Sequence, residues 1–198
     1  MILLAAVVAG LAAGLVRAGL AKRPYQPYMI EHAWLVFLAF ILQWLFFVFP
    51  ASRPKLPGQW APFALVGSQL VLLVFAWLNH RRPGFWLLGF GLAINLLVIT
   101  LNGGWMPLNP AAAAWLVPDP SGSLWHVGAR FGYGKDMVLS ISAARLWFLG
   151  DVLRTPGWLP YRVAFSVGDV LVALGTIWAL WAVGGPLINK STSEVVTS

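Results

Sequence analysis

The stretch "WAPFALVGSQLVLLVFAWLNHRRPGFWLLGFGLAINLLVITL", residues 60–101, decides the fold class. It contains two long apolar runs, 61–79 and 84–101, separated by a basic turn at 80–82 and by Pro83. A membrane-crossing helix needs about 20 mainly apolar residues, and proline is tolerated where a helix begins or ends. Each run therefore predicts a transmembrane helix.

The rest of the chain has the same character. Of its 198 residues, 60% are hydrophobic and only 10% are charged, and the mean hydropathy is +0.79. A soluble domain carries about 25% charged residues, so lipid must cover much of this chain. Three further apolar runs lie at 2–20, 33–49 and 164–184. Together the five runs predict an all-α, polytopic transmembrane helix bundle with five spans.

The spans divide the chain into regions. Residues 1–188 are expected to form a single membrane domain, with an extramembrane segment of short interfacial helices at 102–163. Within that segment, a helix is predicted from Asn109 as N-cap to Pro118, and an amphipathic helix over 135–150. The polar tail 189–198 has the composition of a disordered segment, and we expect only contact with another chain to order it.

The placement of basic residues predicts orientation. Basic residues follow the first apolar run rather than precede it, so this run differs from a signal peptide. They place the N-terminus and the 102–163 segment on the outer side of the membrane. The net charge of +7 is assigned to contacts with the lipid bilayer and not to nucleic acid.

The residue types present exclude several kinds of site. Absence of cysteine excludes disulfides, thiol nucleophiles, Fe–S clusters and covalently attached haem. The three histidines, His32, His80 and His126, lack the spacing of metal ligands. We therefore expect neither a metal nor a cofactor.

Three spans carry a central amide side chain: Gln43, Gln69 and Asn95. An amide in hydrocarbon is costly unless it is hydrogen-bonded, so these three side chains should join neighbouring helices. The alternative is a polar pathway, as in a transporter, or a cofactor contact. In the first span, Gly10 and Gly14 favour close approach of another helix.

Two Gly-Asp pairs, 150–151 and 168–169, raise the question of chemistry. Ser166 and Asp169 have the spacing of a capping box at the start of the last span. Asp151 has arginines at 145, 154 and 162 as candidate partners. The alternative is a shared site in which one carboxyl is protonated and the other ionised.

Three motifs in this order resemble an uncharacterised bacterial family of small polytopic membrane proteins, a domain of unknown function. They are "LNGGWMP" (101–107), "RLWFLGDVL" (145–153) and "RVAFSVGDVLVALG" (162–175). The resemblance implies a multi-pass protein of the bacterial plasma membrane and implies no activity.

A second resemblance is to lipoprotein signal peptidases, which are membrane aspartate proteases. Asp151, Asp169 and the Asn102-Gly103-Gly104 run are similar to that family's motifs in order and spacing, although Ser166 stands where that family has an asparagine. This resemblance implies an intramembrane hydrolase in which the two aspartates act on water and the scissile carbonyl, and Asn102 binds the oxyanion.

The expected function is that of a non-catalytic membrane subunit or scaffold, bound to other membrane protein subunits in a larger complex. The many tryptophans, the small residues of the first span and the absence of a complete catalytic motif favour it. The intramembrane aspartate hydrolase is the alternative.

Overall fold

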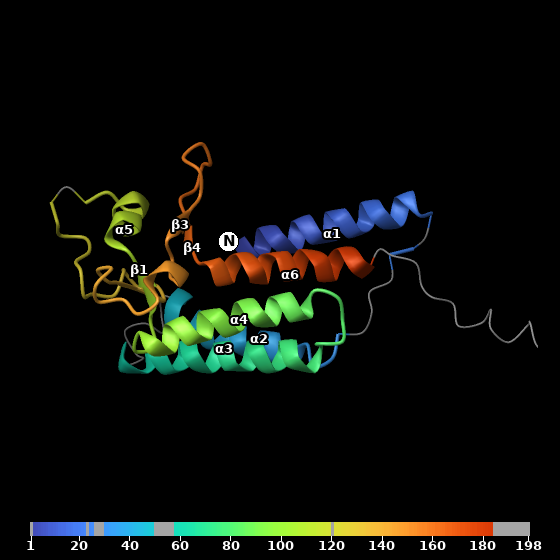
Figure 1. Cartoon of the computed structure of the whole chain (residues 1–198), viewed down its shortest axis with the longest axis horizontal. Helices are drawn as coiled ribbons and strands as arrows, with labels where there is room; N and C mark the ends of the chain where they lie inside the picture. The colour runs from blue at the N-terminus through green and yellow to red at the C-terminus, as the bar shows by residue number, and fades with distance from the viewer. Residues whose placement is uncertain (1, 23, 26–29, 50–57, 120, 184–198) are drawn as a thin grey trace, which may run out of the picture.

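The computed structural model describes residues 2–22, 24–25, 30–49, 58–119 and 121–183. Its dominant feature is a set of long helices lying side by side (Figure 1). These are α1 (Ile2–Leu20), α2 (Trp34–Gln43) with its π-helical continuation Trp44–Val48, α3 (Ala61–Leu78) after a 3₁₀ turn at Gly58–Trp60, α4 (Phe85–Leu101) and α6 (Val167–Val183).

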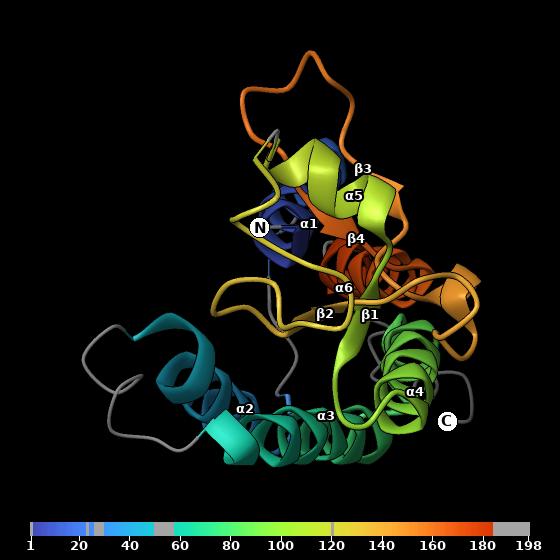
Figure 2. The ribbon, with the colours of Figure 1, turned by 90° about the vertical axis from the view of Figure 1, so that its left-hand side faces the viewer.

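The helices are arranged as an open arc. Helix α1 packs on α6, α6 on α4, α4 on α3 and α3 on α2, and the end view shows this order around the arc (Figure 2). Two helical segments, α1 and Gly58–Leu78, are long and apolar enough to cross a membrane, and the other three are shorter apolar helices. Helix α6 begins at Val167, later than the predicted 164, because Ala164–Phe165 form a strand.

Glycines allow close contact on both sides of α6. A Cβ on Gly168 would lie 2.0 Å from Oδ1 of Asn95, and one on Gly91 would lie 2.6 Å from the Gly168 carbonyl oxygen. On α1, a Cβ on Gly14 would lie 2.6 Å from the carbonyl oxygen of Leu180. The close approach predicted from Gly10 and Gly14 is confirmed, and its partner is α6.

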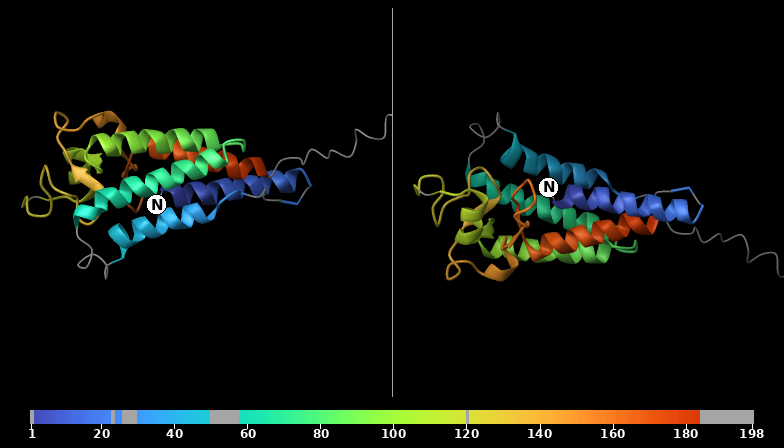
Figure 3. Two further views of the ribbon diagram at one scale, coloured as in Figure 1. Left: turned by 90° about the horizontal axis from the view of Figure 1, so that it is seen from below. Right: turned by 90° about the horizontal axis from the view of Figure 1, so that it is seen from above.

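The segment between α4 and α6 gathers at one end of the bundle (Figure 3). It contains β1 (Met106–Leu108), α5 (Pro110–Leu116), β2 (Asp136–Val138), a 3₁₀ turn (Trp147–Leu149), β3 (Leu153–Arg154) and β4 (Ala164–Phe165). Strands β1 and β2 pair in parallel, and β3 and β4 pair antiparallel. Helix α5 begins as predicted, because Asn109 Oδ1 accepts a 2.6 Å hydrogen bond from the Ala112 N–H.

The predicted amphipathic helix over 135–150 is wrong. Its first residues form β2 instead, since the Met106 N–H donates to the Lys135 carbonyl at 3.1 Å and the Leu139 N–H donates to the Leu108 carbonyl at 3.0 Å. Beyond Ser140 the chain turns, and Leu146 has a φ of 52° that no α-helix contains. Pairing with a distant strand has replaced local helix formation.

Buried side chains connect the bundle to the segment between α4 and α6. One cluster joins Leu65 of α3 and Ile99 of α4 to Met106 of β1. A second joins Leu108 of β1, Ala112 of α5 and Val138 of β2. Strand β1 therefore links the two parts. The predicted tail 189–198 lies outside the described residues.

Candidate functional site

The site begins where α4 ends. Gly104 has a φ of 84°, a conformation that glycine adopts without strain, and its N–H donates to the Ile99 carbonyl at 2.8 Å. A Cβ there would lie 2.5 Å from Cβ of Pro62. This turn directs the chain across the start of α3 and into β1.

Asn102, beside that turn, holds a distant loop. Its Nδ2 donates to the carbonyl oxygens of Val98 at 2.8 Å and Arg145 at 2.9 Å. Its Oδ1 accepts from the Arg145 N–H at 2.9 Å. Both the donor and the acceptor capacity of this amide are therefore directed at backbone groups.

The motif at residues 145–153 also contacts strand β1. The Asp151 N–H donates to the Pro107 carbonyl at 2.9 Å, and a Cβ on Gly150 would lie 2.5 Å from that same oxygen. Glycine is required here because the two backbones are in contact. The motifs around 102 and 151 thus form one backbone unit.

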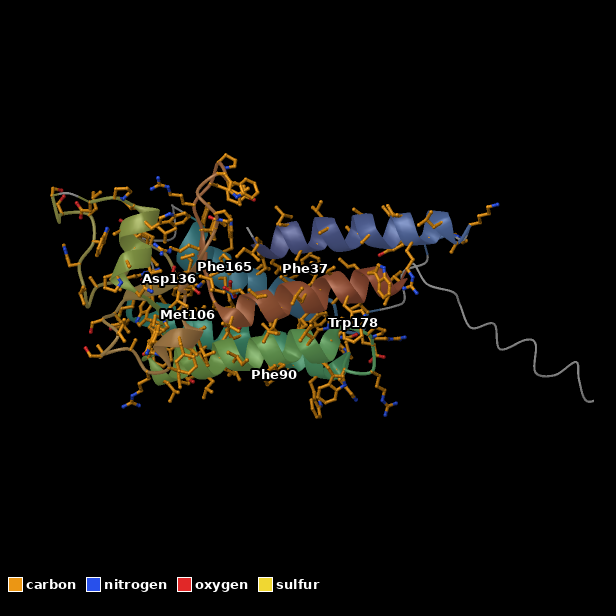
Figure 4. All side chains as sticks on the ribbon, turned by 45° about the horizontal axis from the view of Figure 1, so that its top comes forward. Phe37, Phe90, Met106, Asp136, Phe165 and Trp178 are labelled. Atoms are coloured by element: carbon orange, nitrogen blue, oxygen red, sulfur yellow. The ribbon has the colours of Figure 1, made fainter. Side chains whose placement is uncertain are left out.

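Asp151 is the buried charge of this unit, with only 2% of its surface exposed. Its Oδ2 accepts a 2.6 Å hydrogen bond from Nζ of Lys135, which also lies 2.9 Å from Oδ1 of Asp136. The other oxygen, Oδ1, is buried and has no hydrogen-bond partner among the described residues. Figure 4 shows Asp136 and Met106 at this end of the bundle, near Phe165.

Burial raises the pKa of the Asp151 carboxyl well above its ordinary value, and the charges of Asp136 and Asp169 raise it further against the effect of Lys135. For Lys135, whose side chain is 36% exposed, burial lowers the pKa but the three surrounding carboxylates outweigh it and raise the pKa. The cluster therefore places the Lys135 ammonium against a buried carboxyl whose pKa is raised.

Ser166 and Asp169 form the predicted capping box at the start of α6. The Asp169 N–H donates to Oγ of Ser166 at 3.0 Å, and Asp169 Oδ2 accepts from the Ser166 N–H at 3.2 Å. Asn95 of α4 completes the group, since its Nδ2 donates to Asp169 Oδ1 at 2.9 Å and its Oδ1 accepts from Ser166 Oγ at 2.8 Å. Both oxygens of Asp169 are thus engaged within the fold.

The two glutamines of the predicted spans, Gln43 and Gln69, differ in their hydrogen bonds. Gln43 donates through Nε2 to Oγ of Ser68 at 2.9 Å and so joins α2 to α3. Gln69 is buried as expected, but its Oε1 has no hydrogen-bond partner among the described residues. The expected interhelical bond is therefore present for Gln43 and Asn95, whereas the carbonyl oxygen of Gln69 makes none.

The predicted partner of Asp151 is wrong. In place of an arginine at 145, 154 or 162, it pairs with Lys135, and Arg162 donates to the Trp115 carbonyl at 2.8 Å. Local sequence patterns do not predict this pair, because 16 residues separate its members. A non-local strand pairing brings them together. In the described part of the chain, no group of three or more histidine, aspartate or glutamate side chains is placed to hold a metal ion.

Comparison with known proteins identifies a family and nothing beyond it. No curated protein and no solved structure matches the chain significantly. Residues 28–181 match a protein family, and this range includes α2 to α5, α6 as far as residue 181, and the whole cluster around Asp151 and Asp169. The chain therefore belongs to DUF5317, a family of unknown function.

Proposed function

We propose that this protein is a non-catalytic subunit or scaffold of a larger complex in the bacterial plasma membrane, crossing the bilayer five times. The observation that carries the proposal is the apolar outer surface of the helices. Large side chains that soluble proteins bury are exposed on them, including Phe37, Phe63, Trp77, Trp86 and Phe90. Such a surface needs lipid or another protein to cover it.

Helix lengths support five spans with local adjustment of the bilayer. The segments Trp34–Val48, Phe85–Leu101 and Val167–Val183 are the short ones, and 15–17 residues make a helix of roughly 23–26 Å. A hydrocarbon layer of about 30 Å accommodates shorter helices by thinning. The basic end with Lys22, Arg81 and Arg82 faces the cytoplasm in this placement, and the strands lie outside.

The hydrogen bonds of Asp169 and Asn102 support a structural role for these residues. Asp169 caps α6 and binds Asn95, and Asn102 holds backbone groups rather than an open space. A hydrolase needs one carboxylate to activate water and a donor directed at the oxyanion. Here Asp169 and Asn102, the two residues that would do this, are committed to the fold.

One observation favours the alternative, an intramembrane aspartate hydrolase. Asp151 has a raised pKa and a buried Oδ1 without a hydrogen-bond partner among the described residues, as a general acid awaiting a carbonyl would. Its test is cleavage of a membrane peptide. Activity that Asp151→Asn or Asp169→Asn abolishes, in variants that remain folded, would replace the subunit proposal.

Topology is testable without background, because the chain contains no cysteine. We expect a membrane-impermeant maleimide to label Ser121→Cys in intact cells and Lys22→Cys only after permeabilisation. Equal labelling of both in intact cells contradicts the proposed placement.

The subunit role is tested by extracting the tagged chain from its native membrane into nanodiscs. We expect other membrane proteins to co-purify in fixed ratio, and Asp151→Asn to retain them. A chain that is extracted alone, at the mass of one copy, contradicts the subunit role while leaving the topology intact.

A further inference from the structure

An apolar cavity lies inside the arc of helices. Its volume is about 480 Å³, and its wall is formed by residues of all five long helices, among them Val7, Val36, Leu72, Leu92 and Val172. This volume falls within the range of about 300–1,000 Å³ that is usual for ligand sites. The cavity is therefore large enough to hold a molecule.

The polar groups of the wall are already satisfied. Thr176 donates from Oγ1 to the Val172 carbonyl at 2.8 Å, and Tyr25 donates from its hydroxyl to the Leu180 carbonyl at 3.1 Å. A polar solute entering here would lose its hydrogen bonds to water and gain none from these donors. The occupant must therefore be apolar.

Size decides between the apolar candidates. A spanning helix about 10 Å wide and 30 Å long occupies on the order of 2,000 Å³, several times the volume of this cavity. Neither a partner's helix nor a helix of a second copy fits inside it. A single alkyl chain does.

A basic depression lies next to the cavity. It measures about 330 Å³ and is lined by Glu31, Leu78, Asn79, Arg81 and Arg82. Ile30, in the cavity wall, directly precedes Glu31, whose N–H and carbonyl both bond to the Asn79 side chain at 2.9 Å. With two arginines and one glutamate, the depression favours a phosphate headgroup.

We infer that the bundle binds one anionic phospholipid, with an acyl chain in the cavity and the phosphate headgroup in the depression beside Arg81 and Arg82. Binding in this mode rests on the membrane placement proposed above. The cysteine-labelling experiment reads that placement independently of any lipid, so failure of one proposal is distinguishable from failure of the other.

The test uses the full chain, delipidated in detergent and titrated separately with dioleoyl phosphatidylglycerol and dioleoyl phosphatidylcholine. Native mass spectrometry counts the lipids bound. We expect one phosphatidylglycerol to bind at saturation, more tightly than phosphatidylcholine. Equal affinity for the two headgroups, or no stoichiometric binding, overturns the inference.

Two matched pairs of variants locate the site. Val7→Trp places an indole in the cavity, whereas Val8→Trp, at a neighbouring position that is 60% exposed, does not. We expect Val7→Trp to weaken binding of both lipids by about tenfold, the effect of excluding about two methylenes, and Val8→Trp to leave it unchanged. Equal effects of the two variants contradict a chain inside the arc.

For the headgroup, Arg81→Gln removes a charge of the depression and Lys22→Gln removes one elsewhere at the same end of the bundle. We expect Arg81→Gln to lower the affinity for phosphatidylglycerol about fivefold without affecting phosphatidylcholine. Lys22→Gln should change the affinity for either lipid by less than the roughly fivefold change expected for Arg81→Gln. If the two variants behave alike, the headgroup does not occupy this depression.

Discussion

Ser166 donates a hydrogen bond of 2.8 Å from Oγ to Oδ1 of Asn95, and this contact couples the start of α6 to the middle of α4. The same hydroxyl accepts from the Asp169 N–H. Ser166 thus satisfies one orphan donor of α6 and one buried acceptor of α4 together. A capping residue that also bonds to a neighbouring helix fixes both the start of its own helix and the position of that helix in the bundle.

Ser166→Ala should therefore lower the free energy of unfolding by more than the loss of an ordinary N-cap does. The variant loses the cap and leaves Oδ1 of Asn95 buried without a donor, so we expect the free energy of unfolding to fall by about 2–3 kcal/mol. Ser140→Ala, which removes a hydroxyl bonded only within its own turn, is the control. Unfolding in detergent, followed by circular dichroism, measures both, and equal losses would show that the contact with Asn95 contributes nothing.

Gly168→Ala tests the close packing of α4 and α6. The new Cβ would lie 2.0 Å from Asn95 Oδ1, so the helices must separate and the polar group around Ser166 must open. We expect a loss of about 3 kcal/mol or more in the free energy of unfolding. The matched change Gly67→Ala, in α3 and with nothing within 4 Å, should be neutral or stabilising by up to about 1 kcal/mol. Tolerance of Gly168→Ala would contradict the described approach of the helices.

The raised pKa of Asp151 predicts that the free energy of unfolding depends on pH. Its pKa is higher in the folded state than in the unfolded chain, where an aspartate titrates near about 3.9. The folded state therefore binds more protons, and stability falls as pH rises from about 4 towards the raised pKa, by up to about 1.4 kcal/mol per pH unit. Lys135 adds no slope there because its pKa lies above about 10 in both states.

Asp151→Asn removes this titration and keeps the shape of the side chain. The free energy of unfolding of the original chain, minus that of Asp151→Asn, should therefore become less favourable between pH 4 and 8. Chemical denaturation at several pH values provides the measurement, with Asp136→Asn as a control at the more exposed carboxylate bonded to the same lysine. A difference that instead grows with pH would mean that the Lys135 ion pair outweighs burial.

Local patterns in the sequence predicted local structure. The Ser166 and Asp169 spacing gave the cap of α6, Asn109 gave the start of α5, and Gly10 with Gly14 gave a close helix contact. Each of these depends on residues within one turn or on one helix face. The Lys135–Asp151 pair and strand β2 depend instead on β1, about 30 residues before β2 in the chain. No period or cap encodes that pairing, so a helix was predicted where a strand forms.

Asn102→Asp distinguishes a side chain that holds the 145–153 loop from one that binds an oxyanion. Replacing Asn102 with aspartate keeps the oxygen that accepts from the Arg145 N–H but removes the donors to the Val98 and Arg145 carbonyls. The new carboxylate also faces two carbonyl oxygens. We expect Asn102→Asp to release the loop over 145–153, seen as at least about tenfold faster amide hydrogen exchange there, which corresponds to about 1.4 kcal/mol of local stability.

Asn109 supplies the matched control for this change. Its side chain only accepts, from the Ala112 N–H at the start of α5, and aspartate caps a helix as well as asparagine does. Asn109→Asp should leave amide exchange in α5 and in the 145–153 loop unchanged. If Asn102→Asp also left the exchange of that loop unchanged, the two bonds to Arg145 would not hold it, and the side chain of Asn102 would be available for a ligand.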